Sequence, residues 1–221
     1  MAFQRFFDPF LFGTEILFTI IAVISCFLIY FKTRESYELT KHEGIKYFRG
    51  AFLFFGLSYV LRFLFMLALL SRIAFDFILP RSMLAPLFIL PLGYFSTIGI
   101  FYLIFSTVWK RFKGKSLLIF GHSTAIFLSA ISFFTRSHVI LLFFQSALLL
   151  IGIVLSAVMH KRERKVSQIR VLYLLVSALW LINLWIVDRP RPFSFEMDIF
   201  FELVSLAVFI VIYHKISKWV K

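Results

Sequence analysis

The sequence is poor in cysteine, in acidic residues and in charge overall, and each shortage excludes a class of protein. One cysteine, Cys26, among 221 residues excludes an internal disulfide and a cysteine-based metal site. Charged residues make up 16% of the chain, well below the roughly 25% of an average soluble domain. The five histidines have neither HxxxH nor HExxH spacing, so we expect no bound metal.

Catalytic motifs are also missing. The chain has no GxSxG nucleophile turn, no carboxylate-rich protease motif and no glycine loop that would hold a phosphate. We therefore expect no enzyme activity, no catalytic residue and no cofactor.

Apolar residues dominate what remains. They make up 61% of the chain, 32 of them phenylalanine, and the mean hydropathy is +0.93. Long apolar runs separated by short charged segments favour membrane helices over a barrel, which needs two-residue alternation. The net charge of +13 would suggest nucleic acid binding in a soluble protein. In a membrane protein it indicates basic cytoplasmic loops beside anionic lipid headgroups, so we expect a lipid bilayer and no nucleic acid as partner.

The chain is predicted to form one all-α transmembrane domain over residues 1–221, with seven crossings. A bilayer core takes about 20 helical residues. The predicted crossings cover residues 10–31, 47–70, 82–109, 116–134, 139–159, 171–187 and 199–216. We expect Pro86 and Pro91 to bend or interrupt the third crossing. The charged connection after the first crossing is expected to continue that helix beyond the membrane.

Lys and Arg residues predict the orientation of these helices. Seventeen of the 24 lie in the connections and terminus on one side, six lie on the other side, and Arg62 lies inside a crossing. Because basic residues accumulate in cytoplasmic loops, this asymmetry predicts an external N-terminus and a cytoplasmic C-terminus. The expected location is the cell membrane, with the chain crossing it several times.

Arg62 is the most unusual residue of the sequence. An arginine at the centre of a membrane helix costs about 2.5–3.5 kcal/mol on the translocon scale, so it usually faces protein or water and has a partner. We predict an ion pair with Glu15, with Glu202 as the alternative or third member. Gln145 and Asn183 are expected to complete its hydrogen bonding.

The predicted polar cluster consists of Glu15, Tyr59, Arg62, Gln145, Asn183 and Glu202. Three interpretations stay open at this point. The cluster clamps helices together, or Arg62 extends along its helix to the headgroups, or the cluster forms an outward-facing pocket for a small polar or anionic molecule or a relay for protons.

A possible internal repeat relates the first three crossings to the last three. A shift of 121 residues aligns Tyr59 with Trp180 and Arg62 with Asn183, and a second shift aligns Glu15 with Gln145. An odd helix between the halves would leave both in the same orientation, which is the three-plus-one-plus-three plan of some small transporters.

The run IYFKTRESYELTKHEGIKYFRGAFLFFGLSYVLRF resembles a segment of small seven-helix membrane proteins of archaea. More loosely, it is similar to the seven-helix sensory regions that precede histidine kinases. This resemblance implies no particular activity and no functional residues. From the polar residues we expect a receptor-like or sensory module with an outward-facing pocket around Arg62. A sensor without an output domain would need a separate cytoplasmic signalling partner. The alternative is a small carrier for a polar or anionic solute, built on the three-helix repeat.

Overall fold

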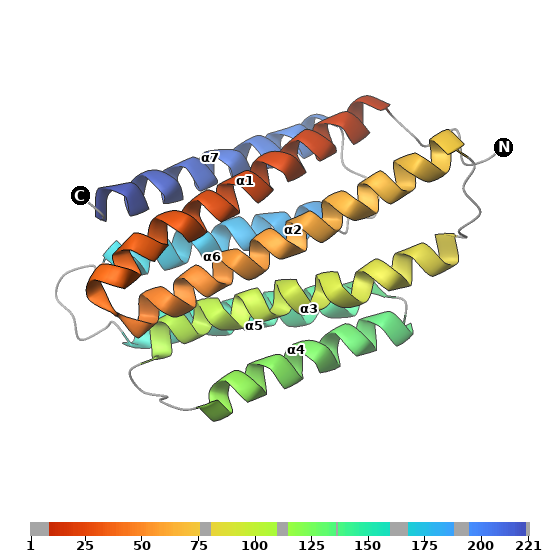
Figure 1. Cartoon of the computed structure of the whole chain (residues 1–221). Helices are drawn as coiled ribbons and strands as arrows, with labels where there is room; N and C mark the ends of the chain where they lie inside the picture. The colour runs from red at the N-terminus through yellow and green to blue at the C-terminus, as the bar shows by residue number, and fades with distance from the viewer. Residues whose placement is uncertain are drawn as a thin grey trace.

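The computed structural model describes residues 9–75, 81–109, 115–135, 137–159, 168–187 and 195–219, and in these ranges the fold is entirely helical (Figure 1). The seven helices are α1 (Pro9–Thr40), α2 (Glu43–Phe75), α3 (Arg81–Val108), α4 (Lys115–Thr135), α5 (His138–Met159), α6 (Gln168–Val187) and α7 (Phe195–Trp219). The predicted fold class, seven helices without a described strand, is confirmed.

The predicted crossings lie inside these helices, except that the third extends one residue past the end of α3. The helices are longer than the crossings because polar residues at their ends continue the helical backbone beyond the apolar run. The largest extension is at the end of α1, which continues to Thr40 as expected. Lys41 then adopts a left-handed conformation with φ of 50°, and its N–H donates to the carbonyl of Tyr37 at 2.7 Å.

α3 differs from one expectation. It passes through Pro86 and Pro91 as one uninterrupted helix. A proline removes one helical hydrogen bond, but neighbouring helices and local adjustments tolerate that loss within a membrane bundle. α3 has such neighbours, because it packs against α2, α4 and α5.

Six of the helices form a closed ring. Contacts run from α1 to α2, α3, α5, α6 and α7 in turn, and α7 returns to α1. α4 lies outside this ring, packed against α3 and α5 (Figure 1). The ring interior is filled mainly by large side chains, including Phe52, Phe55, Tyr173 and Trp180.

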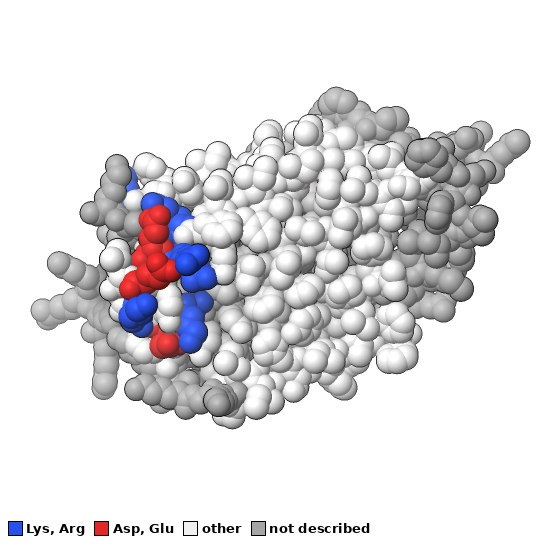
Figure 2. Space-filling view, viewed as in Figure 1, with Lys and Arg blue, Asp and Glu red and all other residues white. Residues whose placement is uncertain are grey.

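The exterior of the bundle is apolar. Large hydrophobic side chains are exposed along its sides, among them Phe134 at 80% and Phe143 at 72%. Figure 2 shows a broad uncharged face, with the visible Lys, Arg, Asp and Glu side chains gathered at the end where α1 turns into α2. Soluble monomers rarely expose so large an apolar area, whereas lipid tails cover one without cost.

The lengths of the helices, like the apolar surface, are those of a membrane protein. Within the described ranges, six helices are long and apolar enough to cross a membrane, and α6 contributes the shorter apolar stretch Val171–Asn183. The chain is therefore a polytopic helical protein of the membrane type. Both the C-terminus and the α1–α2 turn lie at the charged end (Figure 1).

Candidate functional site

Arg62 and Glu15 form an ion pair between α2 and α1. Arg62 Nη2 donates to Glu15 Oε1 at 2.6 Å. Arg62 is only 7% exposed, while the Glu15 side chain is 39% exposed. The geometry is that of the expected pair, and the guanidinium lies within the protein rather than along the lipid-facing surface.

The rest of the α1–α2 interface explains how the two groups meet. Thr19 and Ala22 follow Glu15 at helical spacing on α1, and both are fully inaccessible. The Thr19 hydroxyl donates to the Glu15 carbonyl at 2.7 Å, so it satisfies a backbone group rather than competing for Arg62. A Cβ at Gly56 would lie 3.3 Å from Cys26 Cβ, which shows how closely small residues bring the helices together.

The two amides do not complete the hydrogen bonding of Arg62, so that expectation is wrong. Gln145 Nε2 donates to the hydroxyls of Ser96 and Thr97 on α3, at 2.7 and 2.9 Å. Asn183 Nδ2 donates to Ser205 Oγ on α7 at 2.9 Å. Each amide nitrogen donates to hydroxyls on the helix packed beside it, and these are closer partners than a charged group across the bundle.

Polar contacts therefore occupy three separate interfaces of the ring: α1–α2, α3–α5 and α6–α7. Glu202 is buried on α7, one helical turn before Ser205, and so lies on the Asn183 side of the bundle. Each of these contacts stabilises a helix pair, as intramembrane polar residues commonly do.

On α2 and α6, six buried polar atoms have no hydrogen-bond partner among the described residues. They are Tyr59 Oη, Arg62 Nη1, Tyr173 Oη, Ser177 Oγ, Trp180 Nε1 and Asn183 Oδ1. A buried polar group left unsatisfied costs about 1–3 kcal/mol, so six of them on two helices require an explanation. Structural clamping does not supply one, because an atom without a partner clamps nothing.

Tyr59 lies at the centre of this group. Its ring meets Trp180 of α6 edge to face at a centroid distance of 5.9 Å, and it also contacts Phe18 of α1 and Phe209 of α7. Phe55, one turn earlier on α2, stacks on Trp180 at 4.0 Å. These aromatic contacts place the α2 and α6 polar groups opposite each other inside the ring.

The inward face of α6 was largely missed by sequence reasoning. Tyr173, Ser177, Trp180 and Asn183 follow one another at spacings of four, three and three residues, and all four are buried. Such spacing keeps them on one helix face. The repeat alignment was the signal that could have found them, because it matches Trp180 to Tyr59 and Asn183 to Arg62.

Other polar residues form contacts away from this site. His122 Nδ1 and the Tyr94 hydroxyl lie 2.8 Å apart between α4 and α3, so this histidine has a partner that its sequence context did not reveal. Within the part of the chain that the structure describes, no three histidine, cysteine or acidic side chains group as metal ligands.

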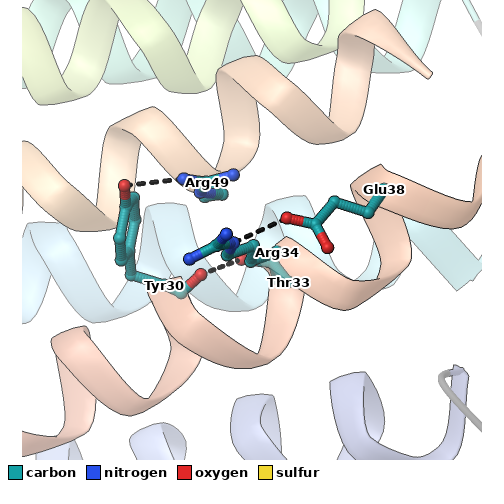
Figure 3. A network of polar contacts seen from close by, with 5 residues as sticks. All are labelled: Tyr30, Thr33, Arg34, Glu38 and Arg49. Carbon is teal, nitrogen blue, oxygen red and sulfur yellow. Dashed lines mark hydrogen bonds and ion pairs between the residues drawn. The ribbon is translucent and has the colours of Figure 1, made fainter. Parts of the chain in front are cut away.

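The charged end has its own polar network, drawn in Figure 3. Arg49 of α2 donates to the Tyr30 hydroxyl at 2.7 Å and lies over the Tyr30 ring, 4.4 Å from its centroid. One turn further along α1, Arg34 bonds Glu38 at 2.6 Å. The first contact ties α1 to α2, and the second supports the helical extension of α1. The basic connections at 110–114 and 160–167 lie outside the described residues.

Comparisons with known proteins give one informative relative. No family model matches the chain, and no solved structure matches it. A protein of Archaeoglobus fulgidus, described as an uncharacterized protein, is 30% identical over 214 residues, which cover 93% of this chain and 92% of the relative. This supports the resemblance to archaeal proteins, whereas nothing in the comparisons supports the likeness to histidine kinase sensory regions. The chain belongs to the same family as this Archaeoglobus protein.

Proposed function

We propose that the chain is a small carrier of the cell membrane that moves a small polar solute across it. The observation that carries this proposal is the set of unpartnered polar groups on α2 and α6, buried inside a closed ring of helices. A bound solute would form hydrogen bonds with these groups. Without the solute they would have no partner among the described residues, as is observed. Buried polar residues of membrane helices commonly mark the path of a substrate or ion.

The polar face of α6 supports a path rather than a closed outer pocket. Ten residues separate Tyr173 from Asn183, which is about 15 Å along a helix and half of a bilayer core of about 30 Å. Tyr173 lies toward the charged end of the helix and Asn183 toward the opposite end. A carrier needs polar groups spread along the membrane normal, so that the solute can pass from one side to the other. A receptor pocket needs its polar groups at a single depth in the membrane.

The arrangement of the helices also favours a carrier. α1–α3 and α5–α7 occupy successive halves of the ring, and α4 lies outside it. In a parallel three-plus-one-plus-three repeat, α1–α3 would correspond to α5–α7. Exchanging these two sets of helices leaves the order of contacts around the ring unchanged, so such a repeat would produce the observed order. Binding at the repeat interface is then expected, and Tyr59 and Trp180 occupy matched positions there.

Uptake into proteoliposomes tests the proposal. Purified protein is reconstituted, and entry of radiolabelled L-alanine, succinate and glucose is compared with entry into protein-free vesicles. We expect at least one solute to enter faster with protein. We also expect the Tyr59→Phe/Trp180→Phe double variant, which removes both donors and keeps an aromatic side chain at each position, to lose most of that uptake. Tyr213→Phe, at an exposed position of α7, is the control. Equal entry with and without protein would contradict a carrier.

A sensory module is the second candidate, and the extension of α1 favours it. Beyond the apolar run, Lys32–Thr40 presents charged side chains at the surface, including Arg34 and Glu38. Such a helix suits contact with a separate signalling partner. A spin label on Glu35→Cys would separate the two proposals. A sensor would change the mobility of that label on ligand binding without moving solute, whereas a carrier would move solute.

A further inference from the structure

Four of the unpartnered atoms, one each on Tyr59, Arg62, Trp180 and Asn183, specify a ligand by their chemistry. Arg62 is 7% exposed, Tyr59 3%, Trp180 5% and Asn183 2%, so bulk solvent does not reach these atoms. Tyr59 and Arg62 are three residues apart on α2, and Trp180 and Asn183 are three apart on α6. Each pair therefore shares a helix face. The 5.9 Å contact between the Tyr59 and Trp180 rings joins the two faces.

The four unpartnered atoms differ in whether they donate or accept a hydrogen bond. Arg62 Nη1 and Trp180 Nε1 can only donate, and the Tyr59 hydroxyl can donate, while Asn183 Oδ1 can only accept. Three donors suit the two oxygens of a carboxylate, and a guanidinium makes the strongest bonds to one. The single acceptor suits a group that donates, such as an ammonium.

Charge selects between a net anion and a zwitterion. The Arg62 charge is already offset by Glu15 at 2.6 Å. Glu202 adds a second carboxyl group, buried on α7 one turn from the Ser205 hydroxyl that holds Asn183. A net anion would bring a second carboxyl group beside one guanidinium that Glu15 already neutralises, and like charges in a low-dielectric interior repel strongly. A ligand whose ammonium balances its own carboxylate avoids that repulsion.

We infer that these four groups bind a small zwitterion of the amino-acid type, with its carboxylate on Arg62, Tyr59 and Trp180 and its ammonium on the Asn183 carbonyl. This inference rests on the proposed function, since it names the class of solute that the carrier would take. Tyr59 and Trp180 hold the carboxylate from opposite helices, so binding draws the two halves of the ring together.

Equilibrium binding to purified protein in detergent tests the inference without requiring transport. The probes are glycine, L-alanine, L-leucine and L-phenylalanine, compared with propionate, ethylamine and glucose. We expect at least one of the four zwitterions to bind, and propionate and ethylamine to bind at least tenfold more weakly. Binding of none of the four, or tighter binding of propionate or glucose, would overturn the inference.

Variants that delete one hydrogen bond locate the site. Tyr59→Phe keeps the ring and removes the donor, whereas Trp180→Phe removes the donor and also shrinks the indole to a phenyl ring. Each should weaken zwitterion binding by about 13- to 160-fold, as loss of one hydrogen bond to a charged group does. The thermal unfolding midpoint of Tyr59→Phe should not fall, since the lost hydroxyl has no partner among the described residues. That of Trp180→Phe should fall, since the smaller ring loses part of its packing against Phe55. Tyr213→Phe, at an exposed position, is the matched control and should bind as the unaltered chain does. Unchanged binding in both donor variants would place the ligand elsewhere.

The two proposals fail in different ways. If a zwitterion binds but none enters proteoliposomes, the carrier proposal is wrong and the ligand class stands. If succinate or glucose enters and no zwitterion binds, the chain is a carrier and the ligand class is wrong.

Discussion

The Arg62–Glu15 pair shows how one residue can organise a membrane bundle. The guanidinium is buried, so it carries most of the desolvation cost, while the more exposed carboxylate keeps part of its hydration. The pair is therefore asymmetric, and its two halves contribute differently to stability.

Glu15→Gln should destabilise the protein more than Arg62→Met does. The first change leaves a buried charge without its anionic partner, at a cost of about 1–3 kcal/mol. The second leaves a carboxylate that is 39% exposed and can be hydrated. Thermal unfolding of the purified variants in one detergent measures both effects.

A charge exchange supplies the control for this comparison. Glu15→Arg combined with Arg62→Glu should unfold at a higher temperature than either single change, because the exchange restores opposite charges across α1 and α2. If the double variant is no more stable than the singles, the two groups do not interact.

Helices in this bundle approach each other where one has a small residue. Gly152 of α5 lies against the Tyr173 hydroxyl of α6, and a Cβ there would also lie 2.9 Å from Ile104 Cγ1 of α3. The same principle brings Gly56 of α2 against Cys26 of α1. These contacts set the distance between helices, and they also position the polar face of α6.

Gly152→Ala should therefore destabilise the fold by about 1–3 kcal/mol, the usual cost of overpacking a closely packed interior. Tyr173 is buried, so its ring has little free space into which it could move away from the added methyl group. Gly13→Ala is the matched control, because nothing lies within 4 Å of a Cβ at that position of α1. The control should leave the unfolding midpoint unchanged or slightly raised. Equal effects of the two substitutions would show that α5 and α6 can separate freely.

At the scale of the whole molecule, the charge distribution defines two ends. The α1–α2 turn and the C-terminus lie at the charged end, and the remaining described surface in Figure 2 is uncharged. If basic loops face the cytoplasm, Ser71 near the end of α2 lies outside and Glu35 on the extension of α1 lies inside.

Cysteine labelling in intact cells tests this orientation. Cys26→Ala first removes the chain's one cysteine, and Ser71→Cys or Glu35→Cys is then introduced. A membrane-impermeant maleimide should label the Ser71 position directly and the Glu35 position only after permeabilisation. The reverse pattern would place the C-terminus outside.

The proposed repeat is only partly reflected in the contacts. Equivalent positions bring Tyr59 and Trp180 together at the centre, as expected near an axis that relates two halves. Glu15 and Gln145 also align, yet Glu15 bonds Arg62 of α2 and Gln145 bonds α3. Equivalent positions therefore do not dictate equivalent partners.

The sequence by itself determined the number of helices and their approximate bounds. These features depend on local apolar content and on the length of each apolar run, which neighbouring residues specify. It also singled out Arg62 and Glu15, because a charge within an apolar helix requires a partner and few acidic residues were available.

Only the tertiary structure decided which helices are neighbours, and with them the partners of the amides. Many apolar helices match one another in composition, so a sequence does not reveal that α3 faces α5 or that α4 lies outside the ring. Gln145 donates to Ser96 and Thr97, and Asn183 donates to Ser205, because each amide bonds to the helix that packs beside it. The free donors of Tyr59 and Trp180 became visible for the same reason, since an atom lacks a partner only in a particular packing.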